Sequence, residues 1–130
     1  MSAPLATDTR ALAGLFTASG VIHLVRSQVF EPIVPAPLRE HDRALVLASG
    51  VAELACAAGL VHPATRRAAG WASVAVLLGV LPANVQMSLD HGRRAQRRQT
   101  PAARGAFAGT LLRLPLQLPM LRAAYRATRR

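Results

Sequence analysis

The sequence predicts an all-α fold: an integral membrane bundle of four transmembrane helices, forming one domain over residues 1–130. Two observations support this prediction. Hydrophobic residues make up 52% of the chain, and the charged residues lie mainly between long apolar segments. Within these segments there is no charge at every helical turn, as there would be on the solvent-facing side of a soluble helix. A membrane bundle therefore fits better than a soluble one.

The apolar segments comprise residues 11–26, 44–61, 68–89 and 105–125. A hydrocarbon core about 30 Å thick requires roughly 20 apolar residues per helix. The first segment is the shortest, and no small-residue cleavage pattern follows it, so we do not interpret it as a signal peptide. Four spans place both termini on the same side of the membrane.

The formal net charge of +10 comes from sixteen basic residues, all of them arginine. Such a charge can indicate nucleic-acid binding. Here the arginines flank apolar segments without an accompanying aromatic face, so we expect the lipid bilayer, and not nucleic acid, as a partner. The arginines are divided almost evenly between the two sides of the membrane, so the positive-inside rule does not decide orientation. The single cysteine, Cys56, excludes a cysteine zinc cage, and we expect no metal.

Two connections between the segments are long. Residues 26–43 are proline-rich and apolar, and we expect them to lie at the membrane surface. Their interface residues are Phe30, Pro32, Ile33 and Pro35. We expect residues 90–104 to form a solvated loop. The alternative role for this loop is binding of anionic lipid head groups, worth roughly 1 kcal/mol per arginine. The arginines concerned are Arg93, Arg94, Arg97 and Arg98.

Small residues predict where the helices approach one another, because helix packing in lipid depends on close contact. Gly105 and Gly109 form a GxxxG pair, and Ala48, Ala52 and Cys56 lie four residues apart on one helical face. We expect Cys56 to be a buried packing residue. Prolines inside the third and fourth segments predict bent helices. They are Pro82, Pro115 and Pro119.

Each apolar segment carries a polar residue that is costly in lipid, and such residues usually face the bundle interior. Their depths along the helices predict that they meet in one half of the bundle. One interpretation is structural: a buried Glu53–Arg113 pair that specifies which helices are neighbours. A second is a ligand pocket, for which a quinone is one candidate, and a third is catalysis. The cluster consists of His23, Glu53, Asn84, Arg113 and Gln117.

Several motifs occur in an order that resembles the DoxX-like family of small bacterial membrane proteins. The match covers about residues 14–126. The motifs are Gly20-x-x-His23, Phe30-x-x-Ile33-Val34-Pro35, Ser49-Gly50-x-x-Glu53, Gly59-Leu60, Pro63-x-Thr65-Arg66-Arg67, Pro82-Ala83-Asn84-x-x-Met87 and Arg113-Leu114-Pro115-Leu116-Gln117.

The resemblance implies a multi-pass protein of the bacterial cytoplasmic membrane. Named relatives in that family are linked to thiosulfate:quinone oxidoreductase subunits and to complexes that handle oxidative or thiol stress. We therefore expect an accessory subunit of a redox or stress-response membrane complex, with a membrane or peripheral protein partner, and not an enzyme by itself. The alternative is a quinone- or lipophile-binding oxidoreductase component that uses the polar cluster. A transporter is a weaker alternative, because no inverted repeat is evident. The ligand and the oligomeric state are not specified by the sequence.

Overall fold

The computed structural model describes residues 4–31, 34 and 36–130, and these residues form helices and turns without strands. The helices are α1 (Thr7–Val25), α2 (Asp42–Val61), α3 (Arg66–Arg98) and α4 (Pro101–Ala127). Between α1 and α2 the described residues include the 3₁₀ turns η1 (Ser27–Val29) and η3 (Ala36–His41). The prediction of an all-helical chain is confirmed. Pro32, Ile33 and Pro35, which the sequence assigns to the interface loop, fall outside the described residues.

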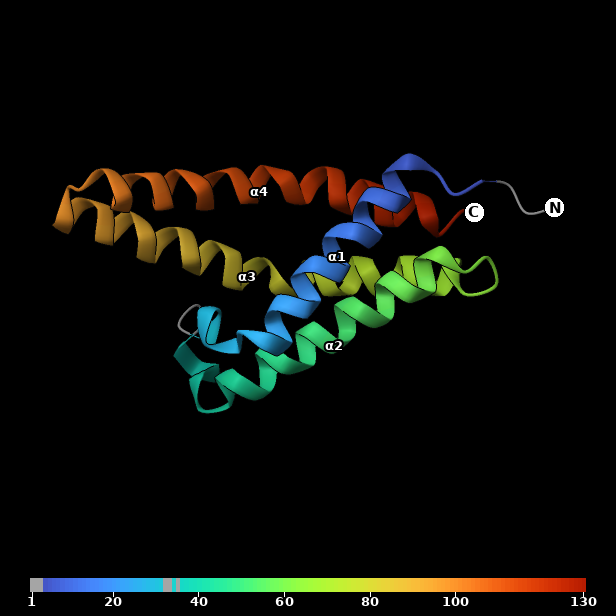
Figure 1. Cartoon of the computed structure of the whole chain (residues 1–130), viewed down its shortest axis with the longest axis horizontal. Coiled ribbons are helices and arrows are strands. Elements are labelled where there is room, and N and C mark those ends of the chain that lie inside the picture. The colour runs from blue at the N-terminus through green and yellow to red at the C-terminus, as the bar shows by residue number, and fades with distance from the viewer. Residues whose placement is uncertain (1–3, 32–33, 35) are drawn as a thin grey trace.

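The helices pack as two antiparallel pairs, α1 with α2 and α3 with α4, and α2 and α3 join the pairs (Figure 1). α3 has 33 residues and α2 has 20. At 1.5 Å per residue, the extra length of α3 is about 20 Å. The α3–α4 hairpin consequently extends past the connection between α1 and α2, as Figure 1 shows. The axis of α3, which contains Pro82, also changes direction near its middle (Figure 1).

The prediction of a loop over residues 90–104 is wrong. α3 continues to Arg98 and only Gln99 and Thr100 separate it from α4. Arginine, alanine and glutamine are good helix formers, so the loss of hydropathy at residue 90 does not end the helix. The turn is made where Gln99 adopts a left-handed conformation, with φ 49°, and the Thr100 side chain caps α4 by accepting from the Ala103 N–H.

One half of the bundle, on the side of both termini, contains the main apolar core. Leu12, Phe16 and Leu60 are at most 1% exposed. Small residues allow the helices to approach closely here: a Cβ on Gly59 would lie 2.7 Å from the Ala69 Cβ, and one on Gly70 would lie 3.0 Å from the Ala124 carbonyl oxygen. Other members of this core are Ala13, Cys56, Ala57, Leu77, Ala123 and Ala127.

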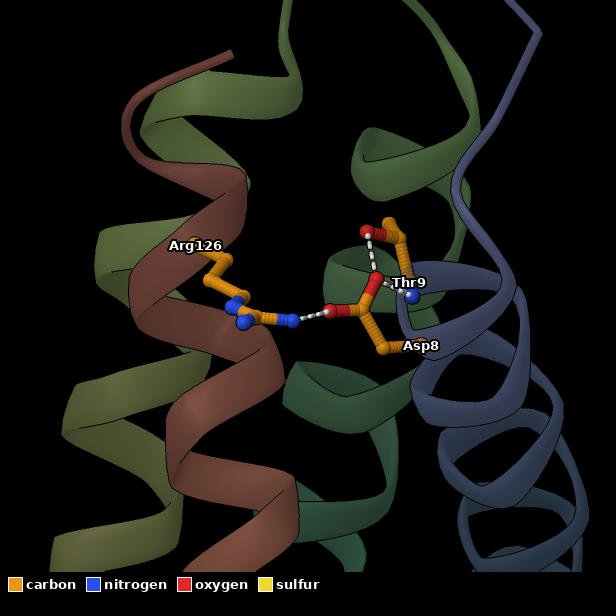
Figure 2. Close-up of polar contacts among 3 residues, drawn as sticks. All are labelled: Asp8, Thr9 and Arg126. Carbon is orange, nitrogen blue, oxygen red and sulfur yellow. Dashed lines mark hydrogen bonds and ion pairs between the residues drawn. The ribbon is translucent and has the colours of Figure 1, made fainter.

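A polar contact also joins α1 to α4 at this end (Figure 2). Arg126 Nη1 donates to Asp8 Oδ2 at 3.2 Å, and the backbone N–H of Thr9 donates to Asp8 Oδ1 at 2.7 Å. Because Asp8 lies in the first turn of α1, its negative charge also complements the helix dipole. The contact fixes the start of α1 against the end of α4.

The small-residue predictions are partly wrong. Open space surrounds Gly105 and Gly109, so this pair marks no helix contact within the described residues, and in the second pattern Ala48 is exposed. Cys56 is buried, as predicted. The α1–α2 crossing instead uses Gly20 and Gly50: a Cβ on either glycine would lie within 3.0 Å of the other's carbonyl oxygen. A glycine pattern shows that close approach is possible, but the facing helix decides whether it occurs.

Candidate functional site

The second half of the bundle encloses a cavity of about 420 Å³ between all four helices and the α1–α2 connection. This volume lies within the range of about 300–1,000 Å³ that is typical of ligand pockets. All five residues of the predicted polar cluster line it. The rest of the wall is mainly apolar, and its buried apolar members are Phe16 from α1, Phe30 and Val34 from the α1–α2 connection, Val46 from α2 and Leu77 from α3.

His23 and Glu53 are the buried charged or ionisable residues of this cavity wall, with 9% and 5% exposure. His23 Nδ1 lies 2.7 Å from the Ser19 carbonyl oxygen and 3.5 Å from Glu53 Oε2. Because a carbonyl oxygen only accepts, the Nδ1 position carries the proton. Glu53 Oε2 is fully buried and has no hydrogen-bond partner in the described part of the chain. The carboxyl group therefore has unused hydrogen-bonding capacity beside the cavity.

Glycine at position 50 brings these two residues together. A Cβ there would lie 2.7 Å from the His23 Cβ, so only glycine permits this approach of α1 to α2. Glu53 lies three residues after Gly50 on the same helical face. The motif Ser49-Gly50-x-x-Glu53 thus has a structural reason: the glycine allows His23 to reach the carboxylate of Glu53.

The α1–α2 connection covers His23. The Phe30 ring stacks on the imidazole at a centroid distance of 4.1 Å and an interplanar angle of 6°. Phe30 in turn packs with Val34 and Val46 in a small apolar cluster. Phe30, Val34 and Leu38 all line the cavity, so this connection forms one of its walls.

Gln117 is the buried polar residue that α4 contributes. Its Nε2 donates to the Leu77 carbonyl oxygen of α3 at 3.0 Å. That bond identifies the other terminal atom as oxygen, and this Oε1 is buried without a partner among the described residues. A second acceptor on the cavity wall thus lacks a donor.

The expected Glu53–Arg113 pair is not formed within the described residues; Glu53 Oε2 instead lies 3.5 Å from His23 Nδ1, without a hydrogen bond between them. Arg113 is exposed, and its Nη1 lies 3.8 Å from Met87 Sδ. It lines the cavity from α4. Asn84 is half-buried on the part of the cavity wall that α3 forms. The nearby Gln86 is occupied elsewhere on α3: its Nε2 donates to Asp90 Oδ1 at 2.9 Å.

Arg93, Arg94, Arg97 and Arg98 are all exposed near the end of α3. They do not take part in the cavity. Across residues 4–31, 34 and 36–130, no group of three or more His, Cys, Asp or Glu side chains is arranged to hold a metal ion.

The wall residues Phe16, Val46 and Leu77 were not identified as site residues from the sequence. For two of them the sequence contains a signal, because they share a helical face with polar residues of the site. Phe16 precedes Ser19 and His23 by three and seven residues, and Val46 precedes Ser49 and Glu53 by the same intervals. Residues at these intervals share a helical face. Leu77 carries half of this signal, because it precedes Asn84 by seven residues while the residue three positions after it, Val80, is apolar.

No curated protein and no solved structure matches the chain. A family model described as a domain of unknown function, DUF8561, matches residues 12–128. This match covers α1 from Leu12 onward, the whole of α2, α3 and α4, and every described residue of the cavity wall. The chain therefore belongs to the DUF8561 family.

Proposed function

We propose that this protein is a four-helix integral membrane protein of the bacterial cytoplasmic membrane that binds a small lipophilic molecule in the cavity. The observation that carries this proposal is the cavity itself, which combines a mainly apolar wall with the buried residues His23, Glu53 and Gln117. An apolar wall with a few placed polar groups is the usual composition of a small-molecule site.

The distribution of apolar residues supports a membrane location. Two helical segments, Ala36–Val61 and Arg66–Arg98, are long and apolar enough to cross a membrane. α1 and α4 do not meet the same criterion of length and hydropathy. Only 33% and 22% of the most apolar stretches in the two segments are buried. A core helix of a soluble protein would bury most of such a stretch. In a bilayer these exposed side chains contact lipid, while the polar groups pair inside the bundle.

In a membrane the α3–α4 hairpin would carry its arginines beyond the hydrocarbon core. α3 is about 50 Å long, compared with a core of about 30 Å. The exposed Arg93, Arg94, Arg97 and Arg98 then lie at or just outside the head-group layer. A cluster of four or more basic residues next to a spanning helix favours anionic phospholipids. Replacing all four with glutamine should reduce phosphatidylglycerol enrichment around the protein in mixed-lipid nanodiscs.

Native mass spectrometry of the protein in mild detergent tests the binding proposal. The variant Ser49→Phe places a ring in the cavity, since Ser49 is half-buried on its wall. The matched control is Ala48→Phe, whose side chain is exposed and does not line the cavity. We expect a co-purified lipophile on the wild type and on Ala48→Phe, and its loss from Ser49→Phe. A lipophile retained equally by Ser49→Phe would overturn the assignment of the site.

A second candidate function is that of an accessory subunit in a redox or stress-response membrane complex, as the DoxX-like resemblance implies. The observation that favours it is the projecting arginine-bearing hairpin, which extends past the α1–α2 connection (Figure 1). A stoichiometric protein that co-purifies from native membranes, and is lost when the four arginines become glutamine, would support this role. Loss of anionic lipid without loss of a partner would instead support lipid binding alone.

A further inference from the structure

We infer that the ligand of the cavity carries a hydroxyl group, as an alkylphenol or the reduced, hydroxyl form of a quinone does, and is not a molecule with acceptors only. This inference rests on the proposed function and specifies its ligand. It follows from two buried oxygen atoms, Glu53 Oε2 and Gln117 Oε1, that have no hydrogen-bond partner within the described residues. Both residues line the same cavity, one from α2 and the other from α4.

Gln117 Oε1 requires a donor. Its amide nitrogen is already committed to the Leu77 carbonyl, so the amide cannot be reversed without losing a buried bond of 3.0 Å. A carbonyl oxygen accepts hydrogen bonds and never donates them. A quinone, an ether or an ester has no hydrogen to offer this atom, whereas a hydroxyl group does.

Glu53 is compatible with a hydroxyl group in either protonation state. An ionised carboxylate only accepts, and a hydroxyl donates to it; a protonated carboxyl can donate, and a hydroxyl oxygen accepts from it. The last side-chain torsion of a glutamate is soft, so the carboxyl group can turn Oε2 toward a bound molecule at low cost. His23 does not satisfy this atom, since its Nδ1 proton is directed to the Ser19 carbonyl at 2.7 Å.

The apolar wall supplies the second part of the recognition. Phe16, Leu77 and Phe30, from three separate parts of the chain, line the cavity with the two polar residues. The ring of Phe30 already stacks on His23, which shows that this part of the wall accommodates flat groups in contact with a ring. A hydroxyl on an aromatic ring therefore matches both the polar and the apolar parts of the cavity.

The test compares 4-octylphenol with its methyl ether, 4-octylanisole, by titration into the full-length protein in nanodiscs. The two probes have the same tail and ring, but only the phenol has a donor. We expect the wild type to bind the phenol about tenfold more tightly, the effect of one hydrogen bond to a buried group. Equal affinities would overturn the inference, because ordered water would then satisfy the two oxygens. The wild-type comparison decides this without any variant.

Glu53→Gln sharpens the result. The glutamine amide offers a donor to the ether as well as an acceptor to the phenol, so the preference should fall severalfold, with the remainder due to Gln117. Glu40→Gln, an exposed carboxyl change outside the cavity, should keep the full preference. An unchanged preference in a folded Glu53→Gln protein would contradict the role of Glu53. The proposed function itself fails, and not only the ligand class, in two cases. Either neither probe binds the wild type, or Ser49→Phe binds both probes as tightly as the wild type does.

Discussion

The two halves of this bundle are built from the same four helices but differ in how closely the helices pack. In the half that contains the termini, Gly59 and Gly70 allow α3 to approach α2 and α4, and leucine and phenylalanine side chains fill the remaining space. In the opposite half, larger polar residues and Pro82 line a cavity. The comparison shows that a close-packed half fixes the geometry, while the half with buried polar residues leaves a volume for a ligand.

Gly20 and Gly50 make a close approach in the polar half, and its loss is expected to have the largest effect. In Gly50→Ala the new Cβ would meet the His23 Cβ at 2.7 Å and the Gly20 carbonyl oxygen at 3.0 Å. Neither atom belongs to the flexible end of a side chain. We expect a loss of about 3 kcal/mol in the free energy of unfolding, at the upper end for an overpacked site. Denaturant titration in mixed micelles, followed by circular dichroism, measures it.

Gly14→Ala is the matched control for this substitution. Gly14 is exposed within α1, and an added Cβ would have no neighbour within 4 Å. Alanine is favoured over glycine inside a helix by about 0.5–1 kcal/mol, so this variant should be neutral or more stable than the wild type. Similar losses in both variants would show that the Gly20–Gly50 contact is not a tight crossing.

A pair of leucine truncations compares the two halves directly. Leu60 is 0% exposed in the close-packed half, whereas Leu45 is 38% exposed and lines the cavity. Leu60→Ala should lower the free energy of unfolding by about 2 kcal/mol. This is the lower end of the range for buried leucines, because lipid already solvates apolar side chains well. Leu45→Ala should cost well under half as much. The same unfolding titration measures both, and equal losses would contradict the difference in packing.

The smallest effect is expected for the surface pair of Asp8 and Arg126 (Figure 2). Burial raises the pKa of Asp8, but the hydrogen bonds from Arg126 and Thr9 and the charge of Arg130 lower it by more, so that the pKa lies below its ordinary value of 3.8. A lowered pKa means that the folded protein favours the ionised carboxylate. The stabilisation is therefore complete above the ordinary value and is lost as the pH falls below it.

Asp8→Asn removes this charge and should reduce the free energy of unfolding by less than about 1 kcal/mol at neutral pH, because both side chains are partly exposed to solvent. The difference from the wild type should shrink with added salt and disappear as the pH falls below 3.8. A difference that stays constant from neutral to strongly acid pH would show that the ion pair is not its cause.

The sequence predicts the helical class because the length and the apolar content of each segment are local properties. It also places His23, Glu53 and Gln117 in one polar cluster, in the middle and in the half away from the termini, and in the structure they line one cavity. It does not predict where α3 ends, since hydropathy falls at residue 90 while helix propensity continues to Arg98.

Contacts between helices could not be predicted in the same way. The Gly105–Gly109 pattern is more conspicuous than Gly20 and Gly50, yet only the latter pair forms a crossing, because each glycine faces the other. The neighbour of Glu53 depends equally on tertiary structure: His23 and Arg113 are both basic side chains of the predicted cluster, but the close approach of α1 to α2 places His23 beside Glu53. The stacking of Phe30 on His23 depends on the path of the chain after α1, which no periodicity specifies.

The central claim is that the polar half of the bundle holds a lipophilic ligand, and photolabelling tests it most directly. An alkylphenol with a photoreactive diazirine in its tail would be bound to the protein in nanodiscs, irradiated, and its adducts mapped by peptide mass spectrometry. We predict saturable labelling of cavity residues such as Phe30, Leu45 and Leu77, which unlabelled 4-octylphenol suppresses. Labelling confined to outward-facing residues such as Leu112 and Leu118, or labelling that the competitor leaves unchanged, would contradict the claim.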